Sequence, residues 1–193
     1  EDETVRAFEK AGAETEVLVF RNRDEEEIRS SILALTEAIG RSQILAFPGG
    51  SSSGDEPDGA GKYIAAVLRK TEVQEAVRQH LKRKGLILGT GNGFQALVRC
   101  GLLPGGNITE AGAKRPLLTQ NAVGRHHDAI VRVRIASNAS PWLKYTKPGE
   151  IYSTAVSARQ GRFWAEKEEL NKLQKNGQII TQYVDHGEEA AMA

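Results

Sequence analysis

A glycine-rich turn at positions 89–93 has the residue spacing of a site that could hold a catalytic nucleophile. It lies between an apolar, strand-forming segment, 85–88, and a helix-forming segment, 94–98, the strand–turn–helix order of a nucleophile elbow. Small neighbours let the central side chain of such an elbow stand clear of the sheet, and Gly89 and Gly93 meet that need. The central residue is Gly91, which cannot form a covalent intermediate. A plain glycine-rich turn without chemistry is the alternative.

No nearby side chain replaces the missing nucleophile. Cys100 is the only thiol, and at ~1.5 Å per helical residue it lies roughly 13 Å beyond Gly91. We therefore expect it to be a small, half-buried apolar residue. Thr90 is adjacent to Gly91, but its side chain should point elsewhere, and a hydroxyl would still need a base to activate it. We expect Thr90 to have a packing role.

The histidines offer few candidate bases. His186 and Glu188 have the His-x-Glu spacing in which a carboxylate can orient an imidazole, although solvated end sequence is the alternative. His126 and His127 should point to opposite faces of an extended segment, so they are not expected to share a metal. A structural hydrogen-bonding role is expected for His126, with a ligand or catalytic role as the alternative. His80 is expected in the solvated last turn of a helix. No Cys/His spacing indicates zinc, and no metal site is predicted.

Hydrophobic periodicity predicts the elements that must position these residues. Helices are expected over 4–11, from the Asp24 cap to Ile39, and over 63–68, 73–82 and 166–173; strands are expected over 16–20, 44–47 and 86–88. This alternation predicts an α/β fold with an open, mostly parallel sheet and helices on both faces. Alternating segments at 130–135 and 150–153 predict antiparallel or edge strands in the C-terminal half. The polar loop 51–59 is expected to line a site at the end of a strand, with a plain linker as the alternative.

Composition limits the classes of function. The chain has 193 residues with 39% hydrophobic content, enough for one sizeable core and one expected domain, and its formal charge of +1 gives no electrostatic case for nucleic acid. A single cysteine fits a reducing cytoplasm. Neither a signal peptide nor an apolar run near the roughly 20 residues of a membrane span is found. We therefore expect a cytoplasmic protein with no membrane partner.

Ordered segments along most of the chain carry a resemblance to a known family. They include Leu-Ala-Phe-Pro-Gly-Gly at 45–50, Asn-Gly-Phe-Gln-Ala-Leu at 92–97, Asn-Ala-Val-Gly-Arg-His at 121–126 and Ser-Asn-Ala-Ser-Pro-Trp-Leu at 137–143. Together they resemble the glutaminase domain of phosphoribosylformylglycinamidine synthase, a purine-biosynthesis glutamine amidotransferase, in its large single-chain form. The resemblance implies a class I amidotransferase fold of the flavodoxin-like type. It also implies L-glutamine as substrate, a synthetase domain or subunit as partner, and no cofactor in this domain.

The resemblance also assigns roles to residues of the elbow. The family's nucleophilic cysteine, in Gly-Ile-Cys-Asn-Gly, falls on Gly91. The oxyanion hole would use backbone N–H groups of Gly49 and Gly50 together with that of Asn92, and such donors do not depend on side chains. Gln95 matches a position near the substrate; an exposed helix residue is the alternative. The resemblance thus implies that glutamine binding can survive the loss of the nucleophile.

Other departures from the family fall at its catalytic residues. The family's His-Gly-Glu-Gly-Arg-Phe reads Ala-Arg-Gln-Gly-Arg-Phe at 158–163. Its catalytic His-Pro-Glu lies beyond the segment that matches 182–185, and its first strand is expected before Glu1; neither is found in this chain. Three hypotheses follow: a degenerate glutaminase domain that does not hydrolyse, an altered or incomplete form of an active amidotransferase, and a non-catalytic interaction or glutamine-binding module. Whether the chain is an enzyme stays open here.

Overall fold

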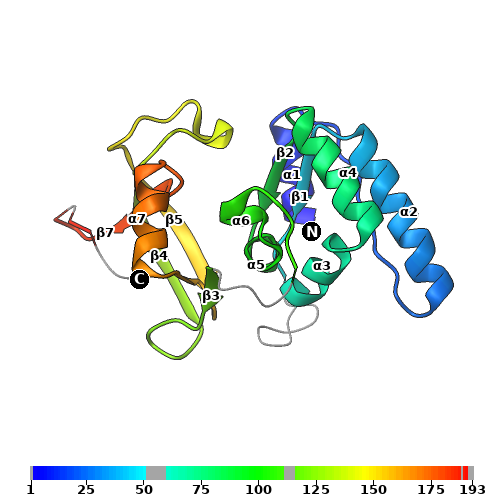
Figure 1. Cartoon of the computed structure of the whole chain (residues 1–193). Helices are drawn as coiled ribbons and strands as arrows, with labels where there is room; N and C mark the ends of the chain where they lie inside the picture. Colours follow the sequence, from blue (N-terminus) through cyan, green and yellow to red (C-terminus); the bar gives the residue numbers. More distant parts are fainter. Residues whose placement is uncertain (1, 51–59, 111–115, 188, 191–193) are drawn as a thin grey trace. The chain divides into compact units, whose positions relative to one another are not determined.

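The computed structural model describes residues 2–50, 60–110, 116–187, 189 and 190 (Figure 1). Its contacts divide the chain into two compact units, Glu1–Lys114 and Arg115–Ala193. Each unit is described by itself. The expectation that both belong to one amidotransferase-like domain stays a prediction, and the predicted site-lining loop 51–59 lies outside the described residues.

The first unit alternates helices with two strands. Its elements are α1 (Asp2–Lys10), α2 (Glu25–Arg41), β1 (Ile44–Phe47), α3 (Ala60–Leu68), α4 (Thr71–Lys82), β2 (Leu86–Gly89), α5 (Asn92–Cys100) and α6 (Leu102–Gly105). β1 and β2 are parallel, in register from Ile44 opposite Leu86 to Phe47 opposite Gly89. The helical connection between them is the crossover that a parallel pair requires. The predicted α/β class with parallel strands is confirmed.

Local sequence signals explain where the longest helix begins and which side it buries. The Asp24 carboxylate accepts a hydrogen bond from the Glu27 N–H at 2.8 Å, as an N-cap does. Ile39 on the same helix is completely buried. The cap and the helical spacing of the apolar residues were both predicted, and both are confirmed.

One face of the β1–β2 pair packs on the hydrophobic core of this unit. Leu45, Phe47 and Ile87 contact a buried cluster drawn from α2, α3, α4, α5 and the start of α6. The cluster comprises Ile39, Ala65, Leu68, Val73, Val77, Leu97, Cys100 and Leu102. The carboxyl ends of both strands, from which the elbow is built, are thereby held on a packed base.

The strand predicted at 16–20 is wrong. The segment has no strand pairing among the described residues, and Val17 and Val19 are 58% and 69% exposed. Leu18 and Phe20 are less exposed, so the alternation of the sequence survives as an alternation of burial. A period of two makes a segment suitable for a sheet, but a strand also needs a hydrogen-bonding neighbour.

His80 is also not the solvated residue that its place at a helix end predicted. It is completely buried, and its Nε2 lies 3.0 Å from the Leu86 carbonyl while Arg83 lies 3.2 Å from Nδ1. A carbonyl only accepts and a guanidinium only donates, so the ring donates through Nε2 and accepts through Nδ1. An added Cβ at Gly85 would come within 2.3 Å of the ring. His80 therefore joins the end of α4 to the start of β2.

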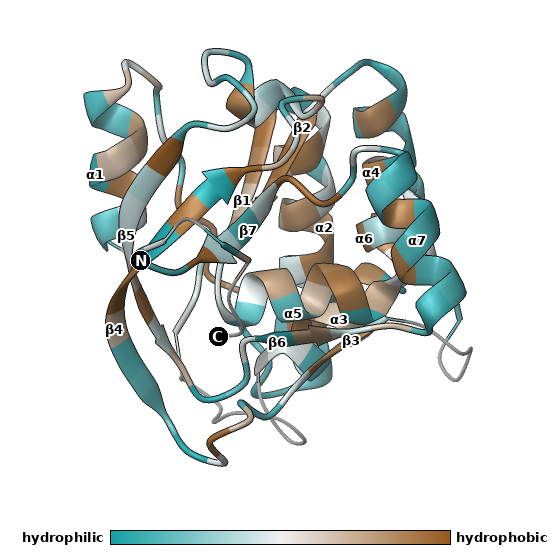
Figure 2. Cartoon of the chain, turned by 90° about the vertical axis from the view of Figure 1, so that its left-hand side faces the viewer, coloured by the Kyte–Doolittle hydropathy of each residue, from teal (hydrophilic) through white to brown (hydrophobic). Residues whose placement is uncertain are grey.

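The second unit consists of short antiparallel sheets and one helix. Its elements are β3 (Leu117–Thr119), β4 (His127–Ile135), the 3₁₀ turn η1 (Pro141–Leu143), β5 (Ile151–Ala158), β6 (Arg162–Trp164), α7 (Lys167–Lys175) and β7 (Thr181–Val184). One sheet has the order β5-β4-β7 and the other pairs β3 with β6. The predicted antiparallel strands of the C-terminal half are confirmed. The helix predicted over 166–173 is confirmed as α7, which Figure 2 colours mostly hydrophilic and in which Leu173 is buried.

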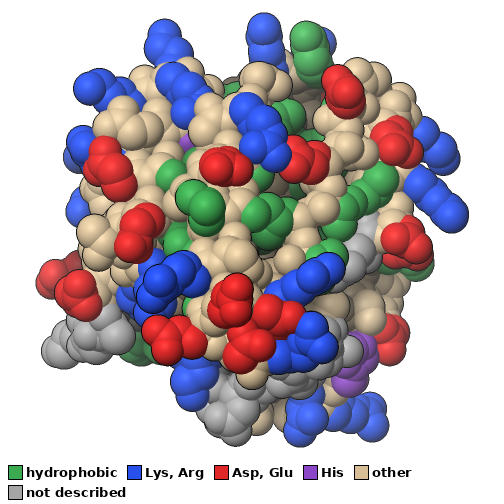
Figure 3. All heavy atoms as spheres, turned by 90° about the vertical axis from the view of Figure 1, so that its right-hand side faces the viewer, with side chains coloured by type: hydrophobic (Ala, Val, Ile, Leu, Met, Phe, Trp, Pro, Cys, Tyr) green, Lys and Arg blue, Asp and Glu red, His purple; other side chains and the backbone are tan. Residues whose placement is uncertain are grey.

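The surface charges are mixed in sign. Figure 3 shows acidic and basic side chains interspersed over the face that carries α2 and α4 in Figure 1. That face offers no single-sign patch of the kind that binds a polyanion. Within the part of the chain that is described, no helix is both long enough and apolar enough to cross a bilayer.

Replacing His80 tests its structural role. We expect His80→Ala to lower the free energy of unfolding by about 3 kcal/mol, because the change leaves a cavity and removes the side-chain hydrogen bonds to the Leu86 carbonyl and from Arg83. Urea denaturation followed by circular dichroism measures this. Lys82→Ala, on the exposed side of the same helix, is the control and should change stability by less than about 0.5 kcal/mol. Equal midpoints for the two variants would mean that His80 is solvated.

Candidate active site

The turn between β2 and α5 has the backbone of a nucleophile elbow. Gly91 is the N-cap of α5 with φ 49° and ψ −120°, a conformation that residues with a side chain adopt only under strain. Two positions later an added Cβ at Gly93 would come within 1.9 Å of the Phe47 carbonyl oxygen. The glycine at 93 is therefore required by close packing. The backbone shape of an elbow is present, with glycine at its central position.

The side-chain direction of position 91 is toward the end of β1. An added Cβ at Gly91 would lie 3.1 Å from the Gly49 Cα and 4.0 Å from the Gly50 nitrogen. The structure thus brings Gly91 together with the turn Pro48–Gly50, two of whose residues the resemblance assigned to an oxyanion hole. These residues come from the carboxyl ends of neighbouring parallel strands, where open α/β sheets bind their ligands.

Three hydrogen bonds join the Pro48–Gly50 turn and its strand to the elbow. The Thr90 N–H donates to the Phe47 carbonyl at 3.0 Å. The Gly49 N–H donates to the Thr90 hydroxyl at 3.1 Å, and the Asn92 side-chain amide donates to the Gly50 carbonyl. The two loops are consequently held in place by backbone and polar side chains.

Two backbone N–H groups next to Gly91 take no part in this hydrogen-bond network. Within the described residues, neither the Gly50 N–H nor the Asn92 N–H makes a hydrogen bond. Asn92 is the first residue of α5, whose leading N–H groups have no partner inside the helix. Paired N–H donors beside a vacant side-chain position suit a carbonyl oxygen on which negative charge can develop. The Gly49 N–H differs, since Thr90 already accepts from it.

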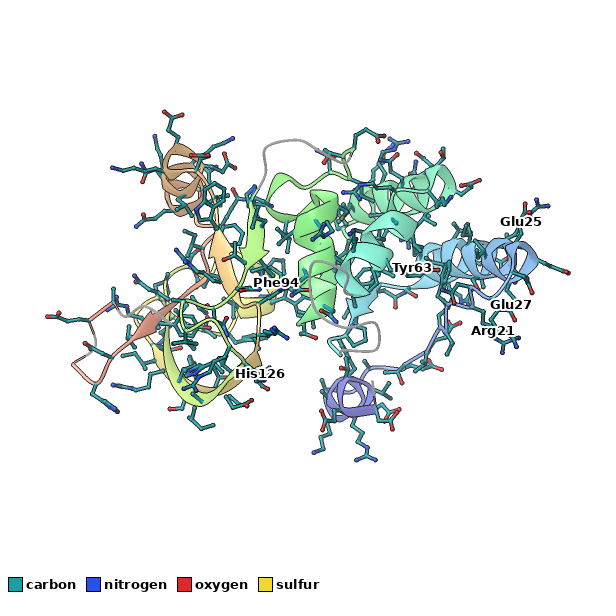
Figure 4. All side chains as sticks on the ribbon, turned by 90° about the horizontal axis from the view of Figure 1, so that it is seen from below. Arg21, Glu25, Glu27, Tyr63, Phe94 and His126 are labelled. Atoms are coloured by element: carbon teal, nitrogen blue, oxygen red, sulfur yellow. The ribbon has the colours of Figure 1, made fainter. Side chains whose placement is uncertain are left out.

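Gln95 is buried in the same helix. It is 7% exposed, so the alternative of an exposed helix residue is wrong. An added Cβ at Gly61 would come within 2.9 Å of the Gln95 Cβ and 3.2 Å of its Oε1. Phe94, the residue before Gln95 in α5, is labelled in Figure 4. The close contact between α3 and α5 thus depends on Gly61, while the role of Gln95 toward a substrate stays a prediction.

Cys100 has the expected role of a small apolar residue, but it is completely buried where half-burial was expected. It is completely buried in the core cluster, and its thiol donates to the Leu97 carbonyl at 3.4 Å. Buried thiols in apolar surroundings are poor nucleophiles. Thr90, in contrast, is exposed and uses its hydroxyl as a hydrogen-bond acceptor, so the packing role expected for it is wrong.

The candidate base lies in the second unit. His186 is exposed and lies in a turn after β7. Two hydrogen bonds close this turn: the Asp185 N–H donates to the Glu189 carbonyl at 3.0 Å, and the Glu189 N–H donates to the Asp185 carboxylate at 2.9 Å. Glu188 lies outside the described residues. The pairing of His186 with Glu188 therefore stays a prediction.

A polar cluster at the β4–β5 hairpin was not predicted. His126 Nε2 lies 3.0 Å from the Ser157 hydroxyl and 3.3 Å from the Asp128 carboxylate, and Figure 4 labels His126. The Ser157 hydroxyl is the main cause that holds the pKa of Asp128 below its ordinary value. In a nucleophilic triad the serine faces one ring nitrogen and the carboxylate faces the other. Here both face Nε2, which agrees with the structural hydrogen-bonding role expected of His126.

The second unit also has a hollow on one face of its three-stranded sheet. Its volume is about 680 Å³, and its lining includes Val133, Tyr152, Thr154, Thr181 and Tyr183. None of the residues that the sequence predicted for a site contributes to this lining. The candidate site is therefore the elbow of the first unit.

Comparisons with known proteins identify relatives along the whole chain. Residues 1–193 match the model of the CobB/CobQ-like glutamine amidotransferase domain. The PurQ subunit of phosphoribosylformylglycinamidine synthase from Gloeobacter violaceus is 31% identical over 142 residues, 72% of this chain and 53% of that protein. The PurQ subunit from Symbiobacterium thermophilum is 34% identical over 139 residues, 72% of this chain and 52% of that protein. The chain thus spans about half the length of these relatives.

A solved structure shares the fold. The structure of PurLQS from Thermotoga maritima matches with a TM-score of 0.54 at 23% identity, over 77% of this chain and 61% of that one. A longer match in sequence comes from the PurQ subunit of Methanococcus maripaludis, 29% identical over 187 residues, 96% of this chain and 62% of that protein. The fold match agrees with the mixed α/β class predicted from the sequence.

The conformation of Gly91 predicts a large effect of one methyl group. We expect Gly91→Ala to lower the free energy of unfolding by about 1–3 kcal/mol, because alanine at this backbone conformation is strained. Gly40→Ala is the matched control, since Gly40 lies in α2 with nothing within 4 Å of an added Cβ. That change should leave stability the same or raise it by up to about 1 kcal/mol. Denaturant midpoints decide, and equal effects would contradict the elbow conformation.

The hydrogen bond from Ser157 predicts a shift in the titration of Asp128. We expect Ser157→Ala to raise the pKa of the Asp128 carboxyl toward its ordinary value, because the largest cause of its lowering is removed. Carbon-13 NMR of the carboxyl group measures this. Ser153→Ala, an exposed position on the same strand, should leave the pKa of Asp128 unchanged. An unchanged pKa in both variants would show that Ser157 does not donate to Asp128.

Proposed function

Because the chain belongs to the family of CobB/CobQ-like glutamine amidotransferase domains, we propose that it is a degenerate glutaminase domain. It binds L-glutamine at the β2–α5 elbow and does not hydrolyse it. One observation carries the proposal: the N–H groups of Gly50 and Asn92, which have no hydrogen-bond partner among the described residues, lie beside Gly91, where the nucleophile is missing. The domain keeps the donors for the amide oxygen and lacks the atom that attacks the amide carbon.

The presence of N–H donors and the absence of a nucleophile determine what the site can do chemically. Hydrolysis of a carboxamide by a nucleophile elbow needs a thiol or hydroxyl that adds to the carbonyl carbon, and donors that hold the resulting oxyanion. Gly91 has no atom to add. In a catalytic unit of this kind, loss of the nucleophile alone removes about six orders of magnitude in turnover. The remaining N–H groups can still donate hydrogen bonds to the carbonyl oxygen of the glutamine side chain.

The relatives support a proposal for pathway and partner. The relatives described above are PurQ subunits of phosphoribosylformylglycinamidine synthase, and the solved structure contains PurL, PurQ and PurS. We place this chain beside a synthetase domain or subunit of the same purine-biosynthesis enzyme, in the cytoplasm. We propose no cofactor for this domain.

A second candidate is an altered form of an active amidotransferase. The elbow backbone favours it, because φ 49° and ψ −120° at Gly91 are the strained geometry that an elbow imposes on its nucleophile. In that case a cysteine at position 91 would stand beside the same two donors. Ammonia release from glutamine by Gly91→Cys, with none from the unaltered chain, supports this candidate.

Calorimetric titration of L-glutamine into the unaltered chain tests the proposed function. We expect a saturable isotherm with no continuing heat and no release of ammonia, because the donors bind the carboxamide while the nucleophile is absent. L-Norleucine, a similar amino acid without a carboxamide, is the control ligand and should bind more weakly. Sustained ammonia release would contradict the loss of activity. Absence of saturable heat would contradict glutamine binding and favour an interaction module.

A further inference from the structure

The Thr90 side chain connects the elbow to the Pro48–Gly50 turn by a hydrogen bond. Its hydroxyl accepts the Gly49 N–H at 3.1 Å across a sequence separation of 41 residues. The backbone of the same residue donates to the Phe47 carbonyl at 3.0 Å. Thr90 therefore bonds on both sides of Pro48, once through its backbone and once through its hydroxyl.

The hydroxyl bond decides which backbone donors of the turn a ligand can reach. With the Gly49 N–H bound to Thr90, the available pair is that of Gly50 and Asn92. The Asn92 side chain fixes Gly50 further by donating to its carbonyl. Gly50 is thus held from both sides, through Gly49 by Thr90 and through its own carbonyl by Asn92.

The same bond keeps the turn close to position 91. An added Cβ there would lie 3.1 Å from the Gly49 Cα, closer than an ordinary van der Waals contact of about 3.5–4.0 Å between carbons. A side chain at 91 must push Gly49 back, whereas the Thr90 hydroxyl holds Gly49 in place. Residues 90 and 91 are therefore coupled in stability.

We propose that Thr90 is a positioning residue, whose hydroxyl closes the Pro48–Gly50 turn onto Gly91 and so preorganises the Gly50 and Asn92 donors for a carbonyl ligand. The effect on a ligand rests on the glutamine binding proposed above; the closure of the turn does not. Thr90 itself is no nucleophile here, because its oxygen accepts from Gly49 and a hydroxyl needs a base to attack.

Two substitutions separate the hydroxyl from the shape of the side chain. Thr90→Val keeps the branched shape and removes the acceptor, whereas Thr90→Ser keeps the acceptor and removes a methyl group. Thr36→Val is the control for loss of a hydroxyl elsewhere, since the Thr36 hydroxyl donates to the Leu33 carbonyl within α2. All three variants are made in the full chain.

Hydrogen exchange of the Gly49 amide, followed by NMR, tests the closure without any ligand. We expect Thr90→Val to speed this exchange at least about fivefold, in line with the loss of one hydrogen bond of about 1 kcal/mol. Thr90→Ser and Thr36→Val should leave it within about twofold of the unaltered chain. Unchanged exchange in Thr90→Val, or equal acceleration in Thr90→Ser, overturns the proposal.

Calorimetry on the same variants tests the consequence for the ligand. Thr90→Val should weaken the affinity for L-glutamine about fivefold, with Thr90→Ser close to the unaltered chain, because a looser turn must be ordered on binding. Equal affinities for Thr90→Val and the unaltered chain overturn the preorganisation of the donors. If the unaltered chain binds no glutamine, the proposed function fails, while exchange at Gly49 still decides whether Thr90 closes the turn.

A double-mutant cycle tests the coupling with position 91. Gly91→Ala should lower the denaturant midpoint less in the Thr90→Val background than in the unaltered chain, because Gly49 is then freer to move back. The same comparison in the Thr36→Val background should show no such difference. Additive midpoint shifts at positions 90 and 91 overturn the closure of the turn onto Gly91.

Discussion

The close approach of the α5 backbone to the end of β1 is the constraint on which the elbow depends. An added Cβ at Gly93 would come within 1.9 Å of the Phe47 carbonyl oxygen, so only glycine allows the helix to start there. The same carbonyl accepts the Thr90 N–H at 3.0 Å. Because both contacts converge on Phe47, the start of α5 and the turn after β1 are placed by one backbone oxygen. The core beneath supports this arrangement, since Phe47 packs against the buried cluster.

Signals contained within one segment predicted the elements well. The Asp24 cap, the apolar spacing of α2 and the strand at 130–135 were predicted from local features, and the structure confirms each, although burial does not alternate along β4. Two predictions that depended on contacts outside the segment itself were wrong. The segment 16–20 has the right period but no neighbour to pair with among the described residues. His80 has a polar local context, and its burial depends on Gly85, which precedes β2, and on the carbonyl of Leu86, the first residue of β2.

The candidate site likewise has parts that the sequence predicted and parts that it did not predict. The position of Gly91 could be predicted, because a strand, a glycine-rich turn and a helix are consecutive in the chain. The hydrogen bond between Gly49 and Thr90 could not, because it spans 41 residues and uses a side chain that was expected only to pack. The cluster of His126, Asp128 and Ser157 likewise depends on the register of β4 with β5. Ligand roles for Gly49, Gly50, Asn92, Gln95 and His186 stay predictions.

The glycine at position 91 also affects the energetics of the turn. A side chain at φ 49° and ψ −120° is strained by about 1–3 kcal/mol, whereas glycine adopts this region readily. The elbow geometry in this chain is held by contacts that involve no nucleophile: the Gly93 packing, the Thr90 bonds and the Asn92 side chain. A side chain at position 91 would therefore add strain, and glycine avoids that strain while the supports of the turn stay in place. For this reason an elbow can lose its chemistry and still keep both its shape and its backbone donors, which is the combination that a carbonyl-binding site without turnover requires.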